Sequence, residues 1–550
     1  MGERAHMTTP GRGDGEGPHW TEPDALIIGA GASGAAVAWS LAQAGFRVVC
    51  LDQGDWVAPA ALPPMGDDWE LRRQTDFNPD PNVRQLPEDY PVSAADSTYT
   101  PLMYNAVGGS TIHWSGHFPR FHPSDFRVRS LDGVADDWPL TYEELAPFYE
   151  FNDRMIGISG LAGDPAYPAR TPRQTRPLPI GPLGETLVSG FEKLGWHWWP
   201  SDTAIISEPY DGRQACNLCG PCDLGCPTGA RSSADVTYWP KALALGVELR
   251  TRCRVREITV DADGRARGAL YYDADGALHE QTAPLVVVAC NGIGTPRLLL
   301  TSRSPAFPDG LANRSGVVGQ NLMYHCYASV GGVFPQPLES YKGPIGACIL
   351  SHEFYETDAR HDFVRGYQLQ AVRQSGPVSA ATGGLVPQRV PWGRDHHRVY
   401  AERFGHMAYL GVMGEDLPEA ENAVTLDPDL TDAHGIPAPH VRYRLSENSN
   451  QMLAHGVARA TEALEAAGAT QTLSANPMPA SGWHLLGTCR MGDDPATSVV
   501  DRWGRAHDVP NLYLVDGSIF VTSAVGNPTT TIQALALRTA DSIRRTHANR

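Results

Sequence analysis

The feature that most constrains the fold lies near the N-terminus, at residues 24–52. A short apolar run (DALII, 24–28) precedes a glycine turn (GAGASG, 29–34), a helix-like segment of small residues, and a second apolar run (FRVVCL, 46–51). Strand, glycine turn, helix and strand in this order form the first unit of a doubly wound parallel sheet. The sequence therefore predicts an α/β fold built on a parallel sheet.

Each glycine of this turn has a stereochemical role in binding a dinucleotide. Gly29 permits the tight turn, Gly31 lets the backbone approach a pyrophosphate at the helix N-terminus, and Gly34 lets the helix pack closely on the strand. Ser33 lies in the same turn, and Asp52 ends the second strand, where a carboxylate can accept hydrogen bonds from an adenosine ribose. Together these residues predict a dinucleotide site; the alternative is a glycine-rich junction without a ligand.

The chain contains one complete fingerprint of this kind. The best second candidate, residues 285–294 (LVVVACNGIG), has Arg297 where the third glycine belongs. An enzyme that moves hydride from NAD(P)H to a flavin normally needs two such sites. A single site therefore favours a tightly held FAD over an exchangeable nicotinamide cofactor.

Charge and length exclude several classes of partner. The 550 residues include 62 Asp and Glu against 44 Lys and Arg, for a formal net charge of −18. Nucleic acids and anionic membranes bind clustered Lys and Arg, so neither is expected as a partner.

Residues 1–20 resemble neither a signal peptide nor a transit peptide, and four glycines interrupt the uncharged segment 25–46. We expect no membrane span and a cytoplasmic location.

Further motifs follow in a fixed order along the chain. They are GGST at 108–111, GWHLLGT at 482–488, VDGS at 515–518 and NPTTT at 527–531. With the N-terminal fingerprint, this series resembles the glucose–methanol–choline (GMC) flavoprotein oxidoreductases. Within that family it is closest to the branch of gluconate, fructose and glucose dehydrogenase large subunits.

The resemblance implies a discontinuous Rossmann-like FAD-binding domain and a mixed α+β substrate (cap) domain. The expected FAD-binding segments are 23–160, 235–330 and 480–550, the cap segments are 161–234 and 331–479, and 1–22 is a flexible tail. Residues 330–420 carry no recognisable motif. In the family, that region usually determines substrate specificity.

The resemblance also places residues around the flavin. Gly108, Gly109 and Ser110 would pass beside the FAD pyrophosphate and flavin, and the backbone at Val255 would meet the adenine. The residues expected to flank the isoalloxazine are Asp516, Gly517, Pro528 and Thr529. The N-terminus of the helix that follows Asn527 would stabilise the negative charge of a reduced flavin.

By resemblance, His484 is the catalytic base. In the family, an alcohol C–H leaves as hydride to flavin N5 while the O–H proton goes to a base, a role that suits histidine. Asn527 matches the second active-site position, where an amide can orient the alcohol oxygen but cannot take its proton. Because Asn527 precedes Pro528, its side chain could instead cap the following helix.

His113 raises the question of a covalent flavin. Some members of the family carry the flavin 8α-methyl group on a His-Trp pair at the spacing of His113 and Trp114 after the paired glycines. The alternative is a hydrogen-bonding histidine beside a non-covalent FAD.

A run of four cysteines, Cys216, Cys219, Cys222 and Cys226, ends before a proline. Its spacing matches the run that bacterial ferredoxins use to bind iron–sulfur clusters. In the dehydrogenase branch, cysteines spaced as the first, third and fourth hold a three-iron cluster between the flavin and a cytochrome partner. Cys219 leaves open a [3Fe-4S] cluster, a [4Fe-4S] cluster, a disulfide or, less favourably, zinc.

The leading interpretation is FAD-dependent oxidation of an alcohol group on a sugar, polyol or related polyhydroxylated compound. A cytochrome or small-subunit acceptor would fit the cysteine run. The alternatives are an oxygen-using oxidase of natural-product biosynthesis, for example on an aminoglycoside, and a lyase in which FAD is structural.

Overall fold

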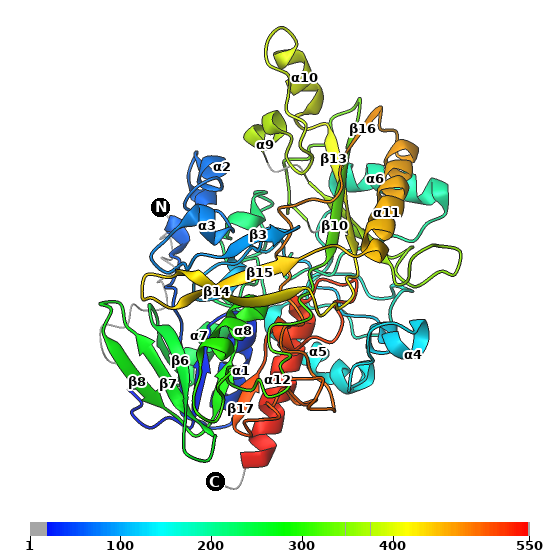
Figure 1. The fold of residues 1–550 in the computed structure, drawn as a ribbon. Helices are drawn as coiled ribbons and strands as arrows, with labels where there is room; N and C mark the ends of the chain where they lie inside the picture. The colour runs from blue at the N-terminus through cyan, green and yellow to red at the C-terminus, as the bar shows by residue number, and fades with distance from the viewer. Residues whose placement is uncertain (1–18, 347, 374–375, 548–550) are drawn as a thin grey trace.

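The computed structural model describes residues 19–346, 348–373 and 376–547. Two sheets organise this part of the chain (Figure 1): a parallel sheet lies beside the C-terminal helix, and an antiparallel sheet lies toward the opposite end. The α/β fold predicted from the sequence is confirmed, with a Rossmann-like unit joined to a mixed α+β region.

The parallel sheet has five strands in the order β17-β9-β1-β2-β5, and every neighbouring pair is parallel. The strands are β1 (Ala25–Ile28), β2 (Val48–Leu51), β5 (Glu248–Arg250), β9 (Val286–Val288) and β17 (Leu512–Leu514). β1, β2, β9 and β17 are fully buried, as expected for a parallel sheet covered on both faces. Segments almost 500 residues apart in the sequence therefore belong to one sheet.

Helices cover this sheet. They are α1 (Ala32–Gln43), α5 (Tyr142–Ile156), α7 (Tyr238–Ala244), α8 (Asn291–Thr301) and α12 (Thr529–His547). α1 packs against α7 and α12, and α12 packs against α5. A capping box formed by Thr141 and Glu144 begins α5, which explains why this helix starts at Tyr142.

The antiparallel sheet has six strands in the order β16-β10-β13-β12-β11-β4. The strands are β4 (Trp199–Pro200), β10 (Cys326–Val333), β11 (Ile349–Ser351), β12 (Tyr367–Val372), β13 (Met407–Gly414) and β16 (Gln471–Ala475). α6 (Gly181–Leu194) and α11 (Glu447–Ala466) pack on one face of it (Figure 1). Leu369 and Ala371 of β12 face these helices, so Gln368 and Gln370 face the opposite side.

Two smaller sheets complete the fold. One contains β3 (Ser93–Ser97), β14 (Ala423–Thr431) and β15 (Pro437–Tyr443), and the other β6 (Arg254–Val260), β7 (Ala266–Tyr272) and β8 (Leu278–Thr282). The short helices are α2 (Trp69–Arg72), α3 (Pro81–Arg84), α4 (Val128–Asp132), α9 (Pro377–Thr382) and α10 (His396–Arg403). The 3-10 turns are η1 (Pro59–Ala61), η2 (Pro63–Met65), η3 (Gly109–Ile112), η4 (Pro123–Phe126), η5 (Cys222–Leu224) and η6 (Gly517–Ile519).

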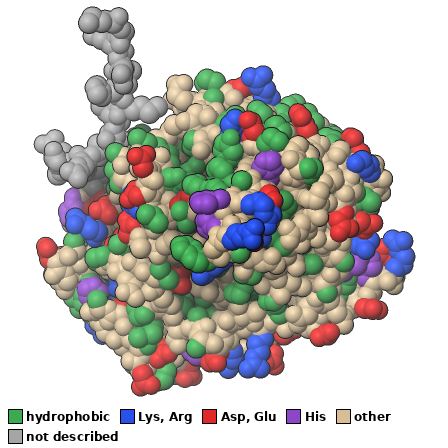
Figure 2. Space-filling model, turned by 90° about the horizontal axis from the view of Figure 1, so that it is seen from above, with side chains coloured by type: hydrophobic (Ala, Val, Ile, Leu, Met, Phe, Trp, Pro, Cys, Tyr) green, Lys and Arg blue, Asp and Glu red, His purple; other side chains and the backbone are tan. Residues whose placement is uncertain are grey.

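α9 and α10 project at the end of the molecule farthest from the C-terminus (Figure 1). Figure 2 looks onto this end and shows histidine and basic side chains lying beside hydrophobic ones. Trp392, between the two helices, is 96% exposed.

The predicted tail, residues 1–22, lies mostly outside the described residues. Its last part contacts the parallel sheet: His19 Nδ1 lies 2.8 Å from Glu248 Oε1, and Trp20 Nε1 donates to Gly246 O. The limits proposed for the domain segments stay a prediction. In the part of the chain that the structure describes, no helix has the length and apolar character needed to cross a membrane.

Candidate active site

One large cavity, about 800 Å³ in volume, lies between the two main sheets. The carboxyl ends of β1 and β2 reach it from one side, where ligands of doubly wound sheets bind, and β10 and β12 line it from the other. Most of the predicted site residues line it: Gly29, Gly31, Ser33, Asp52, Gly109, Ser110, His113, Val255, His484, Asp516, Gly517, Asn527, Pro528 and Thr529. Gly34, Gly108 and the four clustered cysteines are not part of its wall.

The glycine turn has the geometry expected of a dinucleotide site. A Cβ on Gly29 would lie 2.4 Å from Ala289 O, and one on Gly34 would lie 1.9 Å from Gly29 O, so neither position accepts a side chain. A Cβ on Gly31 would meet no atom within 4 Å, because this residue is the N-cap of α1 and faces the open cavity. The turn therefore leaves a cradle of bare backbone at a helix N-terminus.

Asp52 and the paired glycines shape this cradle further. Asp52 accepts hydrogen bonds from Ala30 N at 2.6 Å and Gly54 N at 2.8 Å, and burial raises its pKa to about 6. Gly108 N donates to Ala30 O, and a Cβ on Gly109 would lie 3.0 Å from Gly31 Cα. The GGST loop is thus packed directly on the glycine turn.

His113 lies in the cavity wall with one ring nitrogen unused. Nδ1 lies 2.9 Å from Asp223 O, and the ring packs against Phe77 and Tyr104. Nε2 is buried and has no hydrogen-bond partner among the described residues. Burial lowers the pKa of His113 well below its usual value, so the ring is neutral near pH 7.

Two hydrogen bonds hold the carboxylate of Asp516 in the cavity wall. Its carboxylate accepts from Thr295 Oγ1 at 2.6 Å and from Ser518 N at 2.8 Å. Pro528 and Thr529, at the beginning of α12, line the cavity. The positive end of the α12 dipole therefore borders the cavity.

His484 pairs with a second histidine that sequence analysis missed. Its Nδ1 lies 2.8 Å from Nδ1 of His325, which is 1% exposed and immediately precedes β10. Burial, then the nearby His325 and His117, lower the pKa of His484 well below its usual value. Burial likewise lowers the pKa of His325 to about 3, although backbone groups of residues 523–526 favour its protonated form. Both rings are neutral at physiological pH.

The side chain of Asn527 is held by two glutamines that sequence analysis also missed. Its Oδ1 accepts from Gln370 Nε2 at 2.8 Å and from Gln368 Nε2 at 3.3 Å. No hydrogen bond from an N–H of α12 to this side chain occurs among the described residues. The capping role considered from the sequence is therefore not seen here.

The four cysteines at 216–226 lie in a loop beside the cavity. Arg231 connects this loop to residues 112–114, because it donates to Cys222 O, Trp114 O and Ile112 O. All ten thiols of the chain are free, so the disulfide alternative is not seen here. Within the described ranges, no three His, Cys, Asp or Glu side chains converge on a position suited to a metal ion. The present thiol positions therefore do not fit a cluster, and the iron–sulfur assignment stays a prediction.

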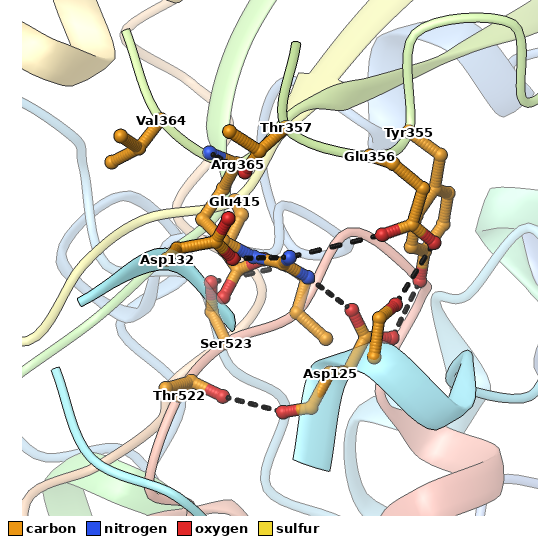
Figure 3. Close-up of polar contacts among 12 residues, drawn as sticks. Asp125, Asp132, Tyr355, Glu356, Thr357, Val364, Arg365, Glu415, Thr522 and Ser523 are labelled. Carbon is orange, nitrogen blue, oxygen red and sulfur yellow. Dashed lines mark hydrogen bonds and ion pairs between the residues drawn. The ribbon is translucent and has the colours of Figure 1, made fainter. Parts of the chain in front are cut away.

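A buried ion cluster contacts the loop at Thr522, a few residues before Asn527 (Figure 3). The Arg365 guanidinium contacts Asp125 Oδ1 at 2.7 Å, Asp132 Oδ2 at 2.9 Å and Glu415 Oε2 at 2.7 Å. Thr522 Oγ1 donates to Asp125 O at 3.4 Å. Four distant chain segments, at 125–132, 365, 415 and 522, are thereby tied together.

Comparison with known proteins identifies the family. Residues 24–327 and 418–536 match the N- and C-terminal models of the GMC oxidoreductases. The chain belongs to the GMC oxidoreductase family. It therefore has an FAD-binding domain and oxidises CH–OH groups, as the motif series implied.

Several curated relatives are similar over nearly the whole chain. The 2-methyl-1,2-propanediol dehydrogenase of Mycolicibacterium austroafricanum is 46% identical over 530 residues, which are 95% of each protein. The fructose dehydrogenase large subunit of Gluconobacter japonicus is 32% identical, covering 94% of this chain and 97% of that one. The 6'''-hydroxyparomomycin C oxidase of Streptomyces lividus is 31% identical, covering 94% and 91%.

Solved structures share the fold. Pyridoxine 4-oxidase from Mesorbium loti superposes with a TM-score of 0.64 at 17% identity, over 95% of this chain and 99% of that one. At this identity the likeness concerns the fold alone.

The residues of the cavity fit an FAD. The open space at Gly31, the contact of the GGST loop with the glycine turn, and the unpartnered Nε2 of His113 all lie on its wall. The first two leave bare backbone for a pyrophosphate, and the third is a buried polar atom that lacks a protein partner.

Proposed function

We propose that this chain oxidises a CH–OH group of a small diol or related polyhydroxylated alcohol, with His484 as the general base. FAD, when bound in the cavity, supplies the hydride acceptor at flavin N5. The substrate class is supported by the relatives named for 2-methyl-1,2-propanediol and fructose.

The observation that carries the proposal is the pairing of His484 with His325. Because their Nδ1 atoms are 2.8 Å apart, one ring must donate and the other accept. In the tautomer proposed here, His484 donates through Nδ1 and His325 accepts, with its own proton on Nε2. His484 Nε2 then carries a free lone pair, and it has no protein partner among the described residues. This nitrogen can take the alcohol proton.

Asn527 would hold the alcohol oxygen while the proton moves. An amide side chain does not exchange protons near neutral pH, so in this arrangement the histidine is the single base. Removing a general base typically lowers a rate by about 10²–10⁴-fold.

Anaerobic mixing of the FAD-loaded enzyme with 2-methyl-1,2-propanediol tests the proposal. We expect the flavin absorbance to bleach, and we expect His484→Ala to slow bleaching by about 10²–10⁴-fold with unchanged flavin content. 2-Methyl-2-propanol is the matched control, because its carbinol carbon has no hydrogen to transfer. A wild-type enzyme that none of a panel of diols, polyols and sugars bleaches would contradict the proposal.

An oxygen-using oxidase is the second candidate, supported by the 31% identity to 6'''-hydroxyparomomycin C oxidase. Stoichiometric hydrogen peroxide during aerobic turnover would favour it, whereas turnover only with an artificial acceptor would favour a dehydrogenase.

Attachment of the flavin through His113 is also part of the proposal, supported by its unpartnered Nε2 in the cavity wall. The cysteines at 216–226 take no part in the proposed reaction, because their positions do not fit a cluster. A cytochrome or small-subunit acceptor stays a prediction.

A further inference from the structure

The two ends of the Asn527 amide are similar in shape and opposite in chemistry. The NH₂ end can only donate a hydrogen bond, and the oxygen can only accept one. The end that faces the reacting alcohol therefore decides whether Asn527 stabilises or repels a developing negative charge on the substrate oxygen. The surrounding hydrogen bonds determine which end it is.

The assignment starts from a backbone carbonyl. Val525 O can only accept, and the amide end of Gln368 that lies 3.2 Å from it must therefore be the donor, Nε2. The same Nε2 lies 3.3 Å from the Asn527 side chain. The Asn527 atom at that position must then be an acceptor, which is Oδ1.

Two further contacts agree with this assignment. Gln370 Nε2 donates to the same Oδ1 at 2.8 Å, and Gln370 is 4% exposed. The other end of Gln368, Oε1, lies 3.1 Å from Nε2 of His352. Burial lowers the pKa of His352 to about 3, so this neutral ring can carry its proton on Nε2 and donate it to Gln368. Each contact along this path then joins a donor to an acceptor.

We propose that Gln368 and Gln370 are positioning residues that fix the Asn527 amide with Nδ2 toward the cavity, so that Asn527 donates to the substrate oxygen. This inference rests on the proposed function. As the alcohol proton passes to His484, the oxygen becomes more negative, and an N–H pointing at it is stabilising. An Oδ1 in the same place would repel it.

A double-mutant cycle on the full-length FAD-loaded enzyme tests the inference. Gln370→Met keeps the length of the side chain and removes the donor, and we expect it to lower the limiting rate of anaerobic flavin reduction by about tenfold or more. In the Asn527→Ala background the same change should alter the rate less than about twofold, because Gln370 acts only through Asn527. If Gln370→Met instead disturbed the structure generally, it would lower the rate by the same factor in both backgrounds.

Gln471→Met is the matched control, since Gln471 lies exposed on β16 of the same sheet and away from the cavity. It should leave the reduction rate unchanged. If Gln370→Met does not retain FAD, Gln370→Leu replaces it in the cycle. A wild-type rate for the single variant, or losses that multiply in the double variant, would overturn the inference while the wild-type enzyme still bleaches. A wild-type enzyme that no alcohol bleaches would overturn the proposed function, and this inference with it.

Discussion

Replacing Arg365 by methionine is the most demanding test of how the site is held. Arg365 is 1% exposed and neutralises part of a cluster that contains Asp125, Asp132 and Glu415. Asp125 and Glu415 are themselves fully buried. Arg365→Met keeps the apolar stem and leaves these carboxylates without their cation.

The magnitude follows from burial. Removing one partner of a buried ion pair costs about 3–5 kcal/mol, because the remaining charge stays in a low-dielectric environment. An unfolding entropy of roughly 2.1 cal/mol/K per residue gives about 1.2 kcal/mol/K for the chain, so the melting temperature should fall by about 3–4 °C. Burial already raises the pKa of Asp125 and of Glu415. Attraction to Arg365 lowers both pKa values in the wild type, so its removal raises them further, and the deficit should grow as the pH rises through the wild-type pKa of each group, about 8 for Asp125.

Thermal unfolding of the FAD-loaded protein, followed by circular dichroism and flavin fluorescence, measures the change. Arg398→Met is the matched control: Arg398 also contacts two carboxylates, those of Asp395 and Glu402, but it lies exposed on α10. It should leave the melting temperature unchanged, as expected for a surface pair. Two results would refute the reasoning: a melting temperature of Arg365→Met within about 1 °C of the wild type, or a difference in melting temperature that shrank as the pH rose.

Four further predictions concern the cavity and its loop. Gly31→Ala should fold normally but lose flavin, measured as the flavin-to-protein absorbance ratio, whereas Gly34→Ala should also melt earlier, because its Cβ would lie 1.9 Å from a backbone oxygen. The rate of flavin reduction should stay constant from about pH 8 to about pH 6.5 and fall only at lower pH, because the pKa of His484 lies well below its usual value; a fall centred near or above about pH 6.5 would contradict this. Flavin should remain with the wild-type protein after denaturation and gel electrophoresis but leave His113→Ala; release from both would refute the covalent bond. The iron and acid-labile sulfide content of the purified protein tests the role of the 216–226 loop. The cysteine spacing in the sequence predicts about three or four irons per flavin, whereas the thiol positions in the structure predict none.

The parallel half of the fold could be predicted from the sequence because its signals are local. The tight turn at Gly29 and the close packing at Gly34 each require glycine for a reason that acts within a few residues, and the structure contains both contacts. The order of the antiparallel sheet was not predicted. Its strands β10, β12 and β13 are buried on both faces, so no alternation of polar and apolar residues marks their register.

The candidate site likewise contains some residues that the sequence could predict and others that it could not. His484 and Asn527 stand in motifs that resemblance could recognise, and both line the cavity. His325, just before β10, and Gln368 and Gln370, on β12, are more than 150 residues away and act through contacts that only the fold creates. A signal for the two glutamines existed: they are separated by one residue in the run YQLQAV, so a strand places both on one face. Two buried amides on one face require partners, and their partner is Asn527.

These contacts suggest a role for the ion cluster at Arg365 in addition to its contribution to the free energy of unfolding. The cavity lies between two sheets: His484 and Asn527 come from C-terminal loops that pack with the parallel sheet, whereas Gln370 comes from the antiparallel one. A shift of one sheet by an ångström would break the 2.8 Å contact that sets the Asn527 amide. Buried ion pairs are a weak source of stability, because desolvation offsets their attraction, but their directional contacts can specify one arrangement. Arg365 lies two residues before the start of β12 and contacts carboxylates before α5 and after β13. We infer that the cluster holds the two sheets in the register that the amide of Asn527 requires, so Arg365→Met should slow flavin reduction even at temperatures where the protein stays folded.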